Sequence, residues 1–286
     1  MKIIAIMAVY NEELYLPLCL RYLWEQGIQS YIIDNGSTDR TPEILRSFLG
    51  RGVIHVEQFP RFDVYEWEPI LRRKEELSYE LPADWFIHHD ADEICQAPYP
   101  YKTLIEGINA VANEGYNSIN FDEFVFVPTG VEENYEYNNF FKEMKYYYFF
   151  EPGPQHRIKA WKIFGQKINL HSSGGHQVQF KGRRVYPKKF IMRHYMVLSL
   201  PHAIRKYCEK VYSEVEYREK GWHGPRAIIK PDQINFPDRK RLNMVTDDDS
   251  WNRSAPWKIH AIFEKVQLNN RVSKLKIFNN IKRLFR

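Results

Sequence analysis

The sequence has few cysteines, no long apolar run and no strong excess of either charge. Its three cysteines (Cys19, Cys95 and Cys208) are scattered and odd in number, so a disulfide framework is not expected. No apolar run approaches the length needed to span a bilayer, and the first residues lack the layout of a secretory signal. We therefore expect a cytoplasmic protein in a reducing environment.

The charge balance is mild, at +5 over 286 residues. A small positive excess favours anionic partners such as phosphates or acidic lipid surfaces, and we expect no nucleic-acid partner. There is no internal repeat and no low-complexity segment. The 44% hydrophobic content is typical of a globular chain long enough to bury a sizeable core.

In the first hundred residues, short apolar runs alternate with segments of helical spacing. The runs are bounded by turn residues, with proline early and glycine just past the end of the first expected helix. Such alternation with short connections predicts an α/β fold with a mainly parallel sheet flanked by helices. The expected strands are 2–9, 31–33, 53–56 and 85–89, and the expected helices are 17–26, a segment opening at 41–43, and 70–81.

A polar motif directly follows three of these strands: YNEE at 10–13, DNGSTD at 34–39 and HDADE at 89–93. In open α/β sheets, ligands bind beyond the carboxyl ends of the strands. Three motifs on one sheet edge are therefore the strongest functional signal. Asp90 and Asp92 suit a hard divalent ion shared with substrate phosphates, although Asp-x-Asp alone is equally typical of a solvated acidic turn.

The second half changes in character. Segments 117–127, 156–164 and 189–198 have the pattern of further strands, which we expect to form an antiparallel extension of the sheet. A helix is expected from Ser199 to Gly221, with Ile204, Cys208, Val211 and Val215 on its apolar face. We predict two domains, a nucleotide-binding and catalytic domain at 1–198 and a mainly helical C-terminal region at 199–286.

The three motifs together resemble the family 2 glycosyltransferases, which have the nucleotide-sugar-binding glycosyltransferase A (GT-A) fold. The resemblance is close over residues 3–50 and 85–94, moderate from there as far as Phe126, and patchy in 173–178 and 193–199. It implies a GT-A, Rossmann-like mixed sheet. It also implies an inverting enzyme that uses a UDP- or GDP-linked sugar and a divalent metal ion, Mn²⁺ or Mg²⁺.

The resemblance also implies roles for single residues around the donor. The loop after the first strand would lie along the nucleotide, Asp34 would accept hydrogen bonds from the base, and Asp90 would contact ribose or a metal-bound water. Arg73 is the nearest candidate for a basic donor contact, with Arg72 or Lys74 as alternatives. The implied donor-binding residues are Val9, Tyr10, Asn11, Glu13, Asp34, Asn35, Arg73, Asp90 and His176.

For the metal ion, the resemblance implies Asp92 and, as a further ligand, His194. The imidazole of His194 would interrupt an apolar strand face, where a satisfied core histidine is the plainer interpretation; as a ligand it would favour Mn²⁺. His176 follows two glycines that let backbone approach a ligand closely, so it could contact diphosphate or acceptor or simply close a turn.

Inverting transfer needs one base to take the proton of the attacking hydroxyl. Glu123 interrupts an apolar strand face, which is costly unless the carboxylate is paired or used, and Asp122 lies on the opposite face. We prefer Glu123 as the base, with Asp122 as its rival. A structural acid paired to a nearby arginine is the competing explanation for Glu123.

The last residues, 271–286, place apolar side chains at helical spacing among lysines and arginines, with no acid. A basic amphipathic helix of this kind can lie on an anionic membrane surface, or its stripe can pack on protein. We expect peripheral contact with the inner face of a membrane.

The expected function is transfer of a sugar to a hydroxyl of a glycan or lipid-linked acceptor, as in polysaccharide biosynthesis. The alternative is a non-catalytic nucleotide-sugar or carbohydrate-binding protein with the same fold. A nucleotidyltransferase is a weaker competitor, since the first loop lacks the glycine-rich, basic sequence that such enzymes carry.

Overall fold

A computed structural model describes residues 1–61, 64–246 and 250–266. Within these ranges the chain forms two compact units. Of the described residues, the first unit comprises those within 1–125 and 151–196, and the second comprises those within 126–150 and 197–266. Residues 126–150, which we had placed in the N-terminal domain, therefore cluster with the C-terminal residues.

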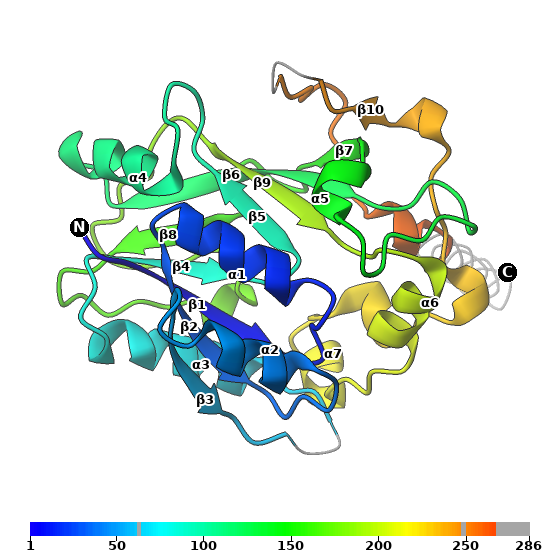
Figure 1. The fold of residues 1–286 in the computed structure, drawn as a ribbon, viewed down its shortest axis with the longest axis horizontal. Helices are drawn as coiled ribbons and strands as arrows, with labels where there is room; N and C mark the ends of the chain where they lie inside the picture. Colours follow the sequence, from blue (N-terminus) through cyan, green and yellow to red (C-terminus); the bar gives the residue numbers. More distant parts are fainter. Residues whose placement is uncertain (62–63, 247–249, 267–286) are drawn as a thin grey trace, which may run out of the picture. The chain divides into compact units, whose positions relative to one another are not determined.

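The first unit is built on a mixed sheet whose core is parallel (Figure 1). Its neighbouring strands run in the order β6, β8, β4, β1, β2, β3, and β9 pairs with both β6 and β5. The pairs β4–β1, β1–β2 and β2–β3 are parallel, whereas β8 is antiparallel to β4 and β6. The strands are β1 (Ile3–Val9), β2 (Gln29–Asp34), β3 (Val53–Gln58), β4 (Trp85–His89), β5 (Glu93–Gln96), β6 (Ser118–Phe126), β8 (Ile158–Lys162) and β9 (Phe190–Tyr195).

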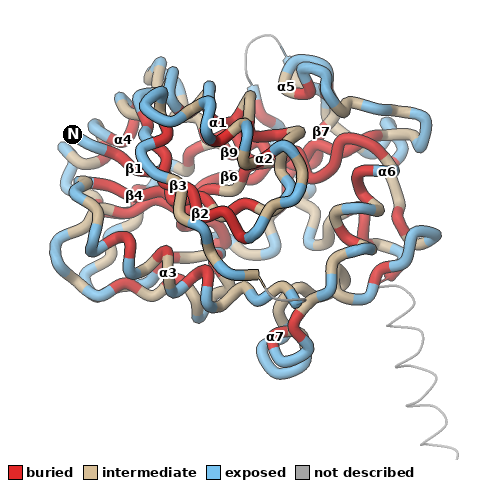
Figure 2. The backbone as a smooth tube through the Cα atoms, turned by 60° about the horizontal axis from the view of Figure 1, so that its bottom comes forward, coloured by how far each residue is buried: buried red, intermediate tan, exposed pale blue. Residues whose placement is uncertain are grey.

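Helices cover both faces of this sheet. In Figure 2, α1 and α2 lie on one side of the buried strands and α3 on the other. Burial on both faces explains why β1 is a continuous apolar run rather than an alternating one. The helices of this unit are α1 (Leu16–Glu25), α2 (Thr41–Phe48), α3 (Trp67–Glu80) and α4 (Leu104–Asn113).

The predicted mixed, mainly parallel sheet flanked by helices is confirmed, and so is the antiparallel extension. In the first unit, the helix α4 and the short strand β5 were not predicted. The N-terminus of α4 carries a capping box between Thr103 and Glu106, a signal that was present in the sequence.

The second unit contains short elements. A two-residue strand, β10 (Asn243–Met244), pairs antiparallel with β7 (Tyr146–Phe150). Its helical elements are α5 (Phe140–Glu143), α6 (Leu200–Ala203), a π-helical turn (Ile204–Cys208), α7 (Glu214–Arg218) and four 3₁₀ turns (Gly224–Ala227, Pro231–Gln233, Arg239–Arg241 and Ala261–Phe263).

The expected continuous helix from Ser199 to Gly221 is wrong. The π-helical turn after α6 changes the helical register, and Ser213 starts a new helix by accepting a hydrogen bond from the Glu216 amide. Val211 and Val215, predicted on a buried stripe, are consequently 59% and 54% exposed.

No helix among the described residues is both long and apolar enough to cross a membrane. The basic segment 271–286 lies outside the described residues. All three cysteines are free thiols.

Candidate donor and metal site

The strand register brings the three polar motifs to one edge of the sheet. Val9 at the end of β1 is paired with Asp34 at the end of β2, and Met7 is paired with His89 at the end of β4. The segments 10–13, 34–39 and 90–93 therefore leave the sheet side by side. This is the edge where ligands bind in open α/β sheets.

The first two loops are held together by polar side chains. Asn11 takes a left-handed backbone conformation (φ 56°). Its side-chain oxygen accepts a hydrogen bond from the Thr38 backbone amide at 2.8 Å, and its backbone amide donates to Ser37 Oγ at 3.0 Å. Glu13 accepts the Arg40 amide at 3.1 Å. Asn11 and Glu13, predicted as donor residues, therefore also fix the shape of the edge.

Asp39 links the same two loops. One of its oxygens accepts the Thr41 amide at 2.8 Å, and the other accepts the Glu13 amide at 3.1 Å. Asp39 thus ties the loop after β1 to the first residue of α2.

Asp34 is 1% exposed, and its carboxylate accepts the Ser37 amide at 3.0 Å and the Gln58 side chain at 3.3 Å. It closes the turn of its own motif while lying at the end of β2. The base contact implied for Asp34 remains a prediction.

Arg61 is a neighbour of this site that sequence reasoning missed. Its guanidinium lies 3.7 Å from the centroid of the Tyr10 ring and donates to Asn35 Oδ1 at 3.0 Å. A cation is thereby added to two residues predicted to bind the donor. The only sequence signal was a basic residue shortly after β3.

Arg73, the basic residue implied to contact the donor, is held by acidic side chains. It lies in the middle of α3 and forms ion pairs with Glu57, Glu76 and Glu80 at 2.8–3.1 Å. Its alternative Lys74 is fully buried, with Nζ 3.0 Å from His88 Nδ1. Burial lowers the pKa of Lys74 to about 8, while the charge of Asp90 opposes that shift.

The acids after β4 are held by a buried lysine from β8. Lys159 Nζ lies 2.6 Å from each Glu93 carboxylate oxygen and 3.1 Å from Asp90 Oδ2. Lys159 is 2% exposed. Burial raises the pKa of Glu93 to about 7 against the opposing effect of Lys159. Burial would also raise the pKa of Asp90, but Lys159, His88 and Lys74 together hold that pKa well below its usual value.

His194 lies between two carboxylates. Pairing of β5 with β9 places it opposite Glu93, and its Nε2 is 3.3 Å from Asp92 Oδ2. Its Nδ1 is 2.6 Å from Glu123 Oε1. Burial alone would lower the pKa of His194, but Asp92 and Glu123 raise it to about 9.

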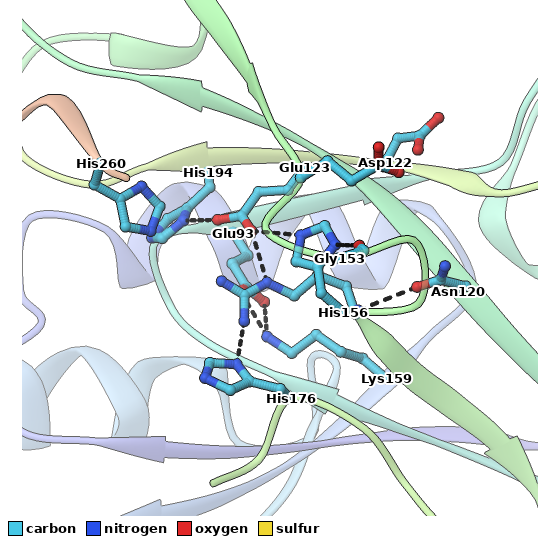
Figure 3. Close-up of polar contacts among 12 residues, drawn as sticks. Glu93, Asn120, Asp122, Glu123, Gly153, His156, Lys159, His176, His194 and His260 are labelled. Atoms are coloured by element: carbon cyan, nitrogen blue, oxygen red, sulfur yellow. Dashed lines mark hydrogen bonds and ion pairs between the residues drawn. The ribbon is translucent and has the colours of Figure 1, made fainter. Parts of the chain in front are cut away.

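Glu123 is 0% exposed and lies at the centre of an ion-pair network (Figure 3). Its Oε2 accepts Arg157 Nε at 2.7 Å and lies 3.2 Å from His156 Nε2. Burial would raise its pKa, but Arg157 and the two histidines hold that pKa well below the usual value. A carboxylate so enclosed and stabilised as the anion is a poor proton acceptor, which disfavours the base role predicted for Glu123.

Asp122, the rival base, points away from this network (Figure 3). It is 4% exposed, and its Oδ1 forms an ion pair with Lys189 Nζ at 3.1 Å. It is therefore also buried beside a cation.

The glycine-containing loop before His176 packs on α3 and β4. The indole of Trp67 donates to the Gly174 carbonyl at 2.9 Å. Gly175 has a left-handed backbone (φ 88°), and a Cβ there would lie 3.1 Å from His88 Nε2. His176 itself is bonded to Arg157, so the loop places an imidazole beside the Glu123 network.

No group of three or more His, Cys, Asp and Glu side chains in the described ranges is gathered as a ready-made metal site. Asp92 Oδ2 and His194 Nε2 are nevertheless close enough to share one ion, and a mixed oxygen and imidazole set suits Mn²⁺. Ions of this kind commonly take one or two protein ligands and fill other positions with substrate phosphates and water. The residues therefore fit a metal that is completed by a diphosphate.

Residues 4–64 match the family model described as Glycosyl transferase family 2. The match makes this segment similar to the family 2 glycosyltransferases. The segment contains β1, β2, β3 and the first two motif loops, so the resemblance is confirmed there, and with the sheet order it supports the GT-A fold. No curated protein matches the chain.

Among solved structures, S. aureus TarS aligns at 13% identity and TM-score 0.43, over 68% of this chain and 37% of that one. TarS 1-349 in complex with UDP aligns at 12% identity and TM-score 0.43, over 71% and 66%. UDP-glucose pyrophosphorylase complexed with UDP-glucose aligns at 11% identity and TM-score 0.27, over 73% and 80%. The chain thus spans less than two thirds of the length of either TarS structure.

Proposed function

We propose that this protein is a metal-dependent, inverting glycosyltransferase. It would move a sugar from a UDP- or GDP-linked donor to a hydroxyl of a glycan or lipid-linked acceptor, as in polysaccharide biosynthesis. The observation that carries the proposal is the register of β1, β2 and β4. It sets the two loops of the family 2 segment beside Asp92 and His194 on one sheet edge.

Asp92 and His194 would hold the metal ion, whose chemistry is Lewis-acid stabilisation of the negative charge on the leaving diphosphate. Asp90 would contact the ribose or a metal-bound water, and Lys159 fixes its carboxylate in place. His176 would lie on the diphosphate or acceptor side. The residues that would line the nucleotide are Val9, Tyr10, Asn11, Glu13, Asp34 and Asn35, with Arg61 added by its stacking on Tyr10.

The base is assigned neither to Glu123 nor to Asp122, because each is buried beside a cation. The same observation favours one alternative, a non-catalytic nucleotide-sugar-binding protein with this fold. Peripheral membrane contact through 271–286 is proposed from the sequence of that segment alone.

Thermal stabilisation by a panel of nucleoside diphosphates and nucleotide sugars, each with and without Mn²⁺, tests the donor site. A ligand that binds only the folded state raises the melting temperature. We expect one nucleotide to stabilise the protein only with Mn²⁺, and Asp92→Asn to abolish that shift.

Asp84→Asn is the matched control, since Asp84 precedes β4 at the opposite end of the strand and accepts the Lys2 amide. It should keep the nucleotide shift. If no nucleotide shifts the melting temperature of the wild type, the donor-site proposal is wrong. Binding together with an absence of transfer to any hydroxyl acceptor would favour the non-catalytic alternative.

A further inference from the structure

Glu123 joins side chains from separate parts of the first unit. Its Oε1 faces His194 of β9, while its Oε2 receives Arg157, which directly precedes β8, and lies near His156 (Figure 3). These partners are 71, 34 and 33 positions away in the sequence. A carboxylate with no exposed surface is costly to bury unless such partners compensate its charge.

The two ring nitrogens of His194 have different neighbours. Nδ1 is 2.6 Å from Glu123, and Nε2 is directed to Asp92. A metal-binding imidazole commonly donates its other ring N–H to a carboxylate, which fixes its tautomer and orientation and raises its basicity. Glu123 is placed to accept such a bond, because Nε2 is the nitrogen that faces Asp92.

We propose that Glu123 is a positioning residue that holds His194 as the Nδ1–H tautomer, with Nε2 directed to the metal position beside Asp92. The inference rests on the proposed function, since the metal belongs to it. A positioning role is compatible with the burial of the Glu123 carboxylate, whereas taking a proton from an acceptor is not.

The second oxygen of Glu123 extends the same arrangement. It fixes Arg157, and Arg157 in turn bonds the His176 imidazole. One buried carboxylate on β6 therefore aligns both the proposed metal ligand and the loop on the proposed diphosphate side. Placement on a strand interior suits this task, because β6 pairs with both β8 and β9.

The affinity of the nucleotide-free protein for Mn²⁺ tests the inference without any turnover. Free Mn²⁺ is measured by its electron paramagnetic resonance signal during titration of wild type, Glu123→Gln and Glu216→Gln. Glu216 is a matched control, a buried glutamate of the second unit paired to His223 at 2.8 Å. Loss of a carboxylate partner typically costs roughly 10–100-fold in metal affinity, so we expect that loss in Glu123→Gln alone.

The outcomes separate the inference from the proposed function. If wild type binds Mn²⁺ and folded Glu123→Gln binds it within twofold as tightly, the positioning role is wrong and the donor site stands. If wild type does not bind Mn²⁺ even with a nucleoside diphosphate, metal dependence falls and the inference falls with it.

A second measurement needs no Glu123 variant. Long-range ¹H–¹⁵N spectra of the imidazoles are recorded for Mg²⁺-loaded wild type, and the His194 signals are identified by their absence in His194→Asn. We expect Nδ1 to carry the proton. A proton on Nε2 would overturn the inference even if Glu123→Gln fails to fold.

Discussion

Replacing Lys159 by methionine should destabilise the first unit in a strongly pH-dependent way. The side chain is 2% exposed and compensates Glu93 and Asp90. Removing one partner of a buried ion pair typically costs about 3–5 kcal/mol, because it leaves an uncompensated buried charge. In the wild type at pH 8.5 both carboxylates are ionised, since the pKa of Glu93 is about 7 and that of Asp90 is far lower. Without Lys159 they either remain as uncompensated buried anions or take up a proton, so we expect the largest loss of stability there.

At pH 5.5 the loss should be much smaller. Glu93 is then protonated with or without Lys159, because its buried carboxyl has a pKa of about 7. Only the contact with Asp90 remains to be lost. The Asp90 side chain is 36% exposed, so that contact is worth about 1 kcal/mol at most. The predicted difference between the two pH values is thus about 2–4 kcal/mol.

Hydrogen exchange of the β4 and β8 amides, measured in EDTA, reports the opening free energy of this unit alone. Lys162→Met is the control, since Lys162 lies at the end of the same strand with its ammonium 4.9 Å from the Phe164 ring centroid. It should lose less than about 0.5 kcal/mol at either pH. An equal loss for Lys159→Met at both pH values, or a loss below about 1 kcal/mol at pH 8.5, would refute the reasoning.

Three further predictions follow from single contacts. In metal-free protein the pKa of His194, about 9, lies above its unfolded value of about 6.5. The stability that this group contributes is fully present below pH 6.5 and is lost as the pH rises through 9, by on the order of 3 kcal/mol. In His194→Asn the free energy of unfolding should therefore depend less on pH over that range. Gly175→Ala and Gly182→Ala should each lower the free energy of unfolding, measured with denaturant, by about 1–2 kcal/mol because both glycines have a left-handed backbone. Gly175→Ala should lose about 1 kcal/mol more, because an added Cβ there meets close neighbours, whereas Gly182 has nothing within 4 Å of one. Arg61→Ala should weaken the binding of the stabilising nucleotide about tenfold by calorimetry, since it removes the cation stacked on Tyr10.

The strands that carry the site could be predicted because local pattern decides them. β1, β2 and β4 are largely buried and each contains a short apolar run, and their polar ends fall on one edge of a parallel sheet. The interruption of the helix after Ser199 could not be predicted, because the apolar spacing of the sequence continues through the π-helical turn, where the exposed face changes.

The pairing of the acids was beyond sequence reasoning for a different reason. Glu123 was identified as a carboxylate on an apolar face, but the partners that decide its role come from distant strands. Likewise the burial of Lys159 beside the acids depends on the antiparallel pairing of β8 with β4. Long-range pairing set these contacts, and no local pattern encodes them.

The central claim is that the loops after β1 and β2 and the acids after β4 form one metal and nucleoside-diphosphate site. It is tested most directly by the affinity for Mn²⁺ measured with and without saturating UDP or GDP. Because Asp92 and His194 leave positions for a diphosphate, one nucleotide should tighten Mn²⁺ binding at least tenfold, and Mn²⁺ should tighten that nucleotide by the same factor. Equal Mn²⁺ affinity with and without both nucleotides would contradict the account.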